Sequence, residues 1–133
     1  SVRERLCSLL IFAGGDKEAE MEIVKTVTAE METYRESLNK YLPAAEKEKE
    51  AQEDNTQAVQ VELSQEDKQN VARIAHKLQP IAQMMQAECQ QQLLALSPEH
   101  ISEQEDKKIR AYIQAVFDDL GNMLGELRNI LSE

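Results

Sequence analysis

The chain has 133 residues, and its 25 acidic against 15 basic side chains give a formal net charge of -10. This charge would repel the phosphates of nucleic acids and the anionic surface of a membrane, so we expect neither as a partner. Hydrophobic residues make up 41% of the chain and aromatic residues only 4%, and the many Ala, Leu, Glu, Gln and Lys residues favour helix. The composition predicts an all-α protein that forms one domain over residues 1–133.

Two helices are predicted before the middle of the chain. The first starts at Val2 and ends at Gly14 and Gly15, where glycine permits a left-handed C-cap. Asp16 then serves as the N-cap of a long second helix, which Pro43 interrupts. The apolar stripe of this second helix consists of Ile23, Val27, Met31, Tyr34, Leu38 and Tyr41.

A strongly acidic stretch follows the second helix. Residues 46–67 hold eight acidic residues and two lysines, so residues 46–63 are interpreted as an acidic, partly solvated insertion. A structureless link of this length is uncommon inside a compact domain. We therefore expect additional helix in residues 44–55 and a return toward the other helices in residues 56–63.

Three further helices are predicted in the second half of the chain. Ser64 or Asp67 can cap the third helix, because Ser-x-x-Asp is a variant of the capping box. A fourth helix is expected over residues 87–97, ahead of Pro98, and a fifth is expected from near Ser102. The apolar residues of the fifth helix have close to heptad spacing: Ile109, Ile113, Val116, Leu120, Met123, Leu127 and Leu131.

Glycines, cysteines and apolar runs give no sign of a membrane or redox function. The longest apolar stretch, residues 9–13, is far shorter than the ~20 residues that a bilayer crossing needs. Gly121 and Gly125 stand among acidic residues, which favours close packing against a neighbouring helix over dimerisation in a membrane. Cys7 and Cys89 have no metal-site spacing, and we expect both to be buried, reduced thiols.

The third helix carries His76, with Pro80 four residues later. On a helical wheel of about 100° per residue, the apolar residues of this helix fall opposite His76, which should therefore face water. These apolar residues are Val71, Ile74, Leu78, Ile81 and Met85. The wheel neighbours of the histidine, which include no carboxylate, are Gln69, Ala72, Gln79, Pro80 and Gln83, flanked by Arg73 and Lys77.

Such surroundings suit the acceptance of a phosphoryl group, which acidic neighbours would oppose and Arg or Lys would assist. Pro80 cannot donate to the carbonyl of His76, so the helix should bend just past the histidine and leave the ring accessible. A metal site is not expected, because positions 72 and 80 offer no ligand and His100 lies in a separate loop. A surface histidine without any function is the alternative at this point.

The stretch "AHKLQPIAQMM", residues 75–85, resembles the phospho-acceptor signature of histidine-containing phosphotransfer (HPt) domains. The segment "FAGGDKEAEMEIVKTVTAEMETYRESLNKYL" is similar to the opening of such domains, and the resemblance covers about residues 10–42 and 64–96. The resemblance implies an up-and-down four-helix bundle with a short extra N-terminal helix. Here, an extended acidic connection would join the second and third helices.

By the same resemblance, His76 accepts a phosphoryl group from a receiver-domain aspartyl phosphate and passes it to another receiver. The receiver supplies Mg²⁺ and the aspartate, so we expect no cofactor, metal site or kinase activity of the chain's own. Phosphoryl support is expected from Lys77, Arg73, Gln79 and Gln83, and receiver docking from Ala72, Gln69 and Pro80. Gln79 and Pro80 replace the usual Lys and Gly of the signature, as in a His-Lys-x-x-Pro subgroup, and Gln86 replaces a glycine after the helix.

We expect a cytoplasmic monomer that forms the end of a hybrid sensor kinase, since the chain begins mid-helix without a methionine; that kinase can itself be membrane-anchored. One competing hypothesis is a helical adaptor in which an exposed apolar patch binds a partner and His76 has no role. Another is a kinase dimerisation module, which would need an adjoining ATP-binding domain.

Overall fold

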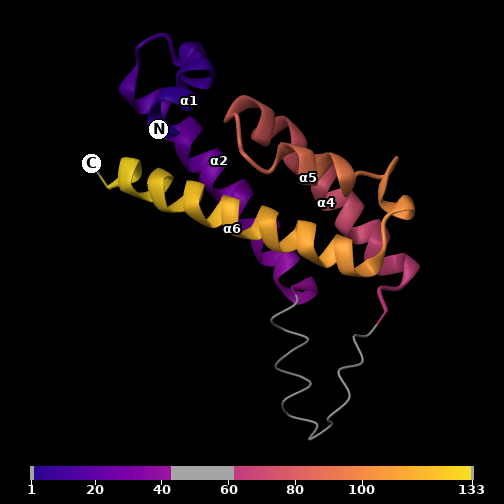
Figure 1. The fold of residues 1–133 in the computed structure, drawn as a ribbon. Coiled ribbons are helices and arrows are strands. Elements are labelled where there is room, and N and C mark those ends of the chain that lie inside the picture. The colour runs from indigo at the N-terminus through magenta and orange to yellow at the C-terminus, as the bar shows by residue number, and fades with distance from the viewer. Residues whose placement is uncertain (1, 43–61, 133) are drawn as a thin grey trace, which may run out of the picture.

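The computed structural model describes residues 2–42 and 62–132, and the regular elements in those ranges are all helical (Figure 1). The helices are α1 (Val2–Leu10), α2 (Lys17–Leu38), α4 (Gln65–Met84), α5 (Gln90–Ala95) and α6 (Asp106–Leu131). Short 3-10 turns cover Ile11–Ala13, Asn39–Tyr41 and Ile101–Glu103. The all-α prediction is confirmed. The helix expected over residues 44–55 and most of the return segment over residues 56–63 lie outside the described residues.

The helix caps are those that the sequence predicted. Gly14 is left-handed, with φ of +61°, and its N–H donates to the Ile11 carbonyl. The Asp16 carboxylate accepts two backbone N–H groups of the first turn of α2, at 2.9 and 3.3 Å. Ser64 and Asp67 form a complete capping box at the start of α4. These caps fix the residue at which each helix begins, and therefore its register.

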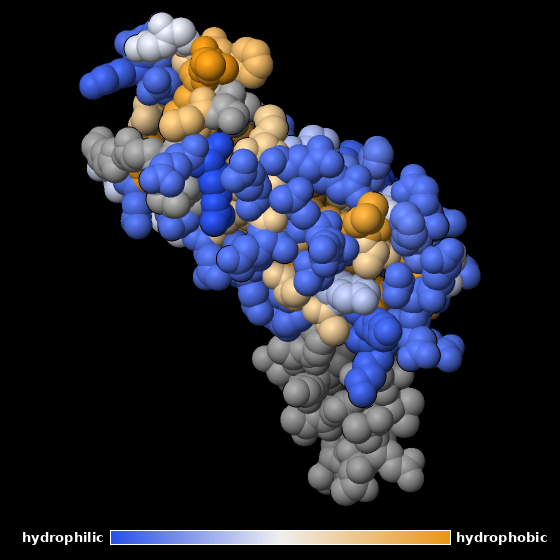
Figure 2. Space-filling view, turned by 45° about the horizontal axis from the view of Figure 1, so that its top comes forward, coloured by the Kyte–Doolittle hydropathy of each residue, from blue (hydrophilic) through white to orange (hydrophobic). Residues whose placement is uncertain are grey.

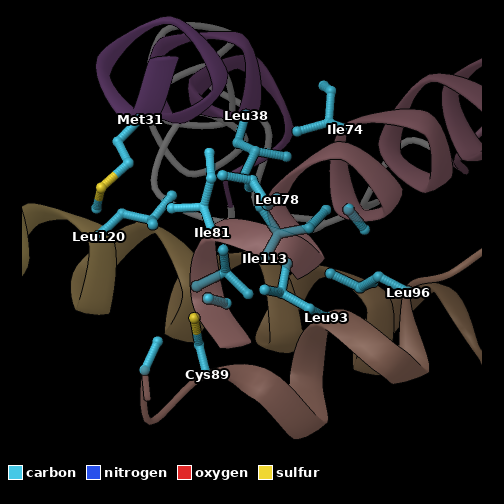
Figure 3. Packing of buried hydrophobic residues seen from close by; sticks show 14 of the residues in the cluster. Met31, Leu38, Ile74, Leu78, Ile81, Cys89, Leu93, Leu96, Ile113 and Leu120 are labelled. Atoms are coloured by element: carbon cyan, nitrogen blue, oxygen red, sulfur yellow. The ribbon is translucent and has the colours of Figure 1, made fainter. Parts of the chain in front are cut away.

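One apolar core holds the helices together. In Figure 1, α6 crosses α2, and its C-terminal end lies near α1 and the start of α2; α4 and α5 lie beside one another. Figure 3 shows side chains from four helices meeting in this core: Met31 and Leu38 from α2, Leu78 and Ile81 from α4, Leu93 from α5, and Ile113 and Leu120 from α6. All of them are buried, and each such side chain contributes about 1.5–3 kcal/mol on burial.

The fourth and fifth helices are shorter than predicted. Residues 86–89 form a turn in which Gln86 is left-handed, with φ of +49°, and the Ala87 N–H donates to the Ala82 carbonyl at 2.9 Å. Only residues 90–95 are then helical. The prediction that the last helix starts near Ser102 is wrong, because residues 97–103 turn tightly and α6 begins at Asp106.

The two glycines of α6 have different surroundings. A Cβ at Gly121 would lie 2.7 Å from Nη2 of Arg35, whose guanidinium stacks 3.6 Å from the Phe117 ring centroid and donates to the Phe117 carbonyl. Gly125 has nothing within 4 Å of that position. Close packing at a glycine is therefore confirmed for Gly121 and wrong for Gly125.

The two cysteines also differ. Cys89 is buried, and burial together with the nearby Asp119 carboxylate raises the pKa of its thiol. The prediction that Cys7 is buried is wrong, because its neighbour Leu6 occupies the inward-facing position of α1. Among the helices in the described ranges, none has the length and apolar character needed to cross a membrane.

Candidate functional site

His76 lies on the outer face of α4, and its side chain is exposed. The residues predicted to face the core are buried: Val71, Ile74, Leu78, Ile81 and Met85. The capping box at Ser64 sets the start of the helix, and the repeat of 3.6 residues per turn then directs residue 76 toward solvent. The wheel-based prediction of its orientation is confirmed.

The His76 ring takes part in no hydrogen bond or ion pair with any residue that the structure describes. His100 differs, since its Nδ1 lies 3.0 Å from the Ser97 hydroxyl. The same hydroxyl lies 2.6 Å from the Leu94 carbonyl oxygen, so it links His100 to the end of α5. His100 is therefore committed to a local structural contact, whereas His76 is available for chemistry.

One carboxylate does approach the histidine, although none lies beside it on the helix. Glu99 belongs to the connection between α5 and α6. Hydrogen bonds from its own backbone N–H and from Ser97 lower the pKa of the Glu99 carboxyl, and the charges of His100 and His76 lower it further. The expectation of acid-free surroundings therefore holds for α4 alone. A helical wheel describes a single helix and cannot show a carboxylate that comes from another segment.

A groove of about 430 Å³ runs between the end of α2 and α4, on one side of His76. Arg73 and Lys77 line it, and so does Lys40, from the 3-10 turn that follows α2. All three side chains are exposed. Among the described residues that line it, Glu36 is the only acidic one, which makes this part of the groove a basic feature of an acidic chain.

A second groove, of about 390 Å³, has His76 itself in its lining and separates α4 from the connection between α5 and α6. Gln69 lines it and is exposed, as predicted for a docking residue. Ala72, predicted to be part of the docking surface, is instead buried with 4% exposure, because the segment that contains Pro98 and Ile101 lies over that side of the helix. Ala72 therefore shapes the bottom of this groove.

The two glutamines lie apart from the basic side chains. Gln79 and Gln83 line a third depression, of about 210 Å³, together with Leu93 and Leu94 of α5. Arg73 and Lys77 line the groove on the α2 side. Pro80 is exposed, and α4 continues through it to Met84. The glutamines and the basic side chains expected to support a phosphoryl group thus line different depressions, and Arg73 also lines the groove that contains His76.

Sequence reasoning missed Lys40, Glu99, Pro98 and Ile101, which the fold brings to the two sides of His76. All four come from segments other than α4, so no spacing within that helix could have identified them. In residues 2–42 and 62–132, no group of three or more His, Cys, Asp or Glu side chains is placed to hold a metal ion.

The chain matches no protein-family model, and the searches of curated proteins and of solved structures found no similar protein.

Proposed function

We propose that this chain is a phosphorelay intermediate, in which His76 accepts a phosphoryl group from the aspartyl phosphate of a receiver domain and passes it to another receiver. The observation that carries the proposal is the His76 ring itself, which is exposed at the middle of a capped helix and makes no hydrogen bond or ion pair within the described residues. The resemblance of residues 75–85 to the HPt signature supports the same function.

The arrangement of the helices fits an up-and-down four-helix bundle made of α2, α4, α5 and α6, with α1 as the short extra helix. Such a bundle holds one imidazole in a fixed position on its surface. Phosphoryl transfer depends mainly on positioning and on charge stabilisation, and a rigid, core-anchored helix supplies the first of these.

The transfer step requires little from this chain. An unprotonated ring nitrogen of His76 attacks phosphorus while the other ring nitrogen keeps its proton. A P–N bond forms as the acyl phosphate P–O bond breaks, and the receiver's aspartate leaves as a carboxylate. The receiver contributes Mg²⁺ and that aspartate. Arg73 and Lys77 flank the ring and offset the phosphoryl charge, and the Gln79 and Gln83 amides are the expected hydrogen-bond donors on the other side.

The partners are response-regulator receiver domains, and the chain acts as a cytoplasmic monomer without kinase activity, within or beside a sensor kinase. The net charge of -10 disfavours nucleic acid as a partner.

The direct test is incubation of the chain with a radiolabelled, phosphorylated receiver domain. The wild type is expected to acquire label that is stable in alkali and labile in acid, as a phosphoramidate is. His76→Gln should acquire none, while the matched variant His100→Gln should be labelled like the wild type. Label on His76→Gln at the wild-type level would contradict the assignment.

A second candidate function, a helical adaptor, is favoured by a separate surface. Ile11 and Phe12 are 75% and 83% exposed in the turn after α1. Figure 2 shows hydrophobic side chains gathered at this N-terminal end, while the rest of the visible face is mostly hydrophilic. Under this hypothesis Phe12→Ser abolishes partner binding and His76→Gln does not. Phosphotransfer that persists in Phe12→Ser favours the relay.

A further inference from the structure

Building on the proposed relay function, we infer that the groove between α2 and α4 is a docking site for an acidic surface of the phosphoryl-donating receiver, and that Lys40 is a specificity-determining residue for it. We name it the basic groove and define it by Lys40, Arg73 and Lys77. Lys40 comes from the 3-10 turn that follows α2, whereas Arg73 and Lys77 belong to α4.

The position of Lys40 is set by the fold. Tyr41, the next residue, is buried at the end of the 3-10 turn Asn39–Tyr41. The Lys40 ammonium lies 5.1 Å from the centroid of the Tyr41 ring, within the range of a cation–π contact. Lys40 is distant from His76 in sequence, but it lines the same groove as Lys77, the residue next to His76.

The cations of the basic groove have no ion-pair partner in residues 2–42 and 62–132. The guanidinium of Arg73 donates to the neutral side chain of Asn70 at 2.9 Å. Elsewhere, Lys25 pairs with Glu22 and Lys68 pairs with Asp106. In a chain of net charge -10, a local group of cations without an ion-pair partner in the described part of the chain favours association with an acidic surface and raises the association rate.

The shape of the groove indicates a protein surface as the occupant. A small anion is usually held by converging donors in an enclosed site, as where backbone N–H groups form a cradle. Here the three cations are all exposed, and they line an open groove of about 430 Å³ on one side of His76. A partner seated in the groove would therefore lie beside the reacting ring.

The test measures phosphoryl transfer from a phosphorylated receiver to wild type, Lys40→Glu and Lys25→Glu at low and high salt. Lys25 is the matched control because it is an exposed lysine on α2 outside the basic groove, and the substitution changes net charge equally. We expect Lys40→Glu to lower kcat/KM about three- to tenfold at low salt through KM, with a smaller loss at high salt. Lys25→Glu should change kcat/KM by less than about twofold.

A second arm replaces the receiver with phosphoramidate, a small donor that requires no docking. Lys40→Glu should then be labelled on His76 as fast as the wild type. Equal losses in Lys40→Glu and Lys25→Glu, or slower labelling of Lys40→Glu by phosphoramidate, would overturn the docking inference and leave the relay function intact. Absence of transfer from the receiver to the wild type would overturn the relay function and, with it, the docking inference.

Discussion

His76 and His100 lie in two regions of the molecule, and their imidazole rings have different surroundings. On α4, the apolar face of a capped helix is buried, and His76 is left exposed without a hydrogen bond to any residue that the structure describes. In the connection between α5 and α6, the chain turns tightly and the His100 ring shares a hydrogen bond with the Ser97 hydroxyl. The comparison shows that a helix anchored in the core can present a reactive group, whereas an irregular connection uses its polar groups to hold itself together.

The largest expected difference is between the two histidine variants. His76→Gln should abolish acid-labile labelling while leaving the free energy of unfolding within about 0.5 kcal/mol of wild type, because an exposed side chain is changed. His100→Gln should keep phosphoryl transfer, but its free energy of unfolding should fall by about 1 kcal/mol, because the hydrogen bond to Ser97 is lost. Urea unfolding together with the transfer assay checks both. Loss of phosphoryl transfer in a folded His100→Gln variant would contradict the purely structural role of His100.

The inner and outer faces of α4 should respond differently to truncation. Leu78→Ala removes a fully buried side chain and is expected to cost about 2–5 kcal/mol of unfolding free energy. Lys77→Ala, one residue away, should cost less than about 0.5 kcal/mol. Chemical denaturation followed by circular dichroism measures both values. Similar costs for the two variants would show that α4 is not anchored as described.

The Glu99 carboxylate interacts electrostatically with both histidines. Its carboxylate opposes a phosphoryl group on His76, so Glu99→Gln should raise the fraction of phosphorylated chain at equilibrium with the receiver by about two- to threefold. Glu126→Gln, an exposed position on α6, is the matched control. An unchanged equilibrium in Glu99→Gln would show that this carboxylate does not influence the phosphoryl group.

A smaller contrast is expected between the two glycines of α6, because Gly121 packs against Arg35 and Gly125 has no atom within 4 Å of its Cβ position. Gly125→Ala should stabilise the fold by up to about 1 kcal/mol, because alanine is the better helix former and the added methyl group meets no other atom. Gly121→Ala should gain less or lose stability, because Arg35 must leave its contacts with Phe117. Thermal unfolding measures the difference. A larger gain at Gly121 than at Gly125 would contradict the described packing of α2 against α6.

Much of the fold could be predicted from local signals. The apolar repeats, together with the caps at Asp16 and Ser64, set the registers of α2 and α4, and with them the outward position of His76. The start of α6 could not be predicted, because the acidic residues after Ser102 resemble a first helical turn. The burial of Ile101 and the hydrogen bonds to the Ser97 carbonyl decide that segment instead.

Only the part of the surroundings of His76 that belongs to α4 could be predicted from the sequence. The residues on α4 follow from helical geometry, but Lys40 and Glu99 reach the site from other segments, and the burial of Ala72 depends on the connection that contains Pro98 and Ile101. These contacts form only when distant segments pack together, so periodicity within one helix carries no information about them.

The most direct test of the relay function is NMR of the chain with ¹⁵N-labelled histidine, recorded before and after incubation with a phosphorylated receiver domain. The relay function predicts that one ring nitrogen of His76 acquires a bond to phosphorus while both nitrogens of His100 keep their signals. Unchanged His76 signals while the receiver loses its phosphoryl group, or a bond to phosphorus on His100, would contradict it.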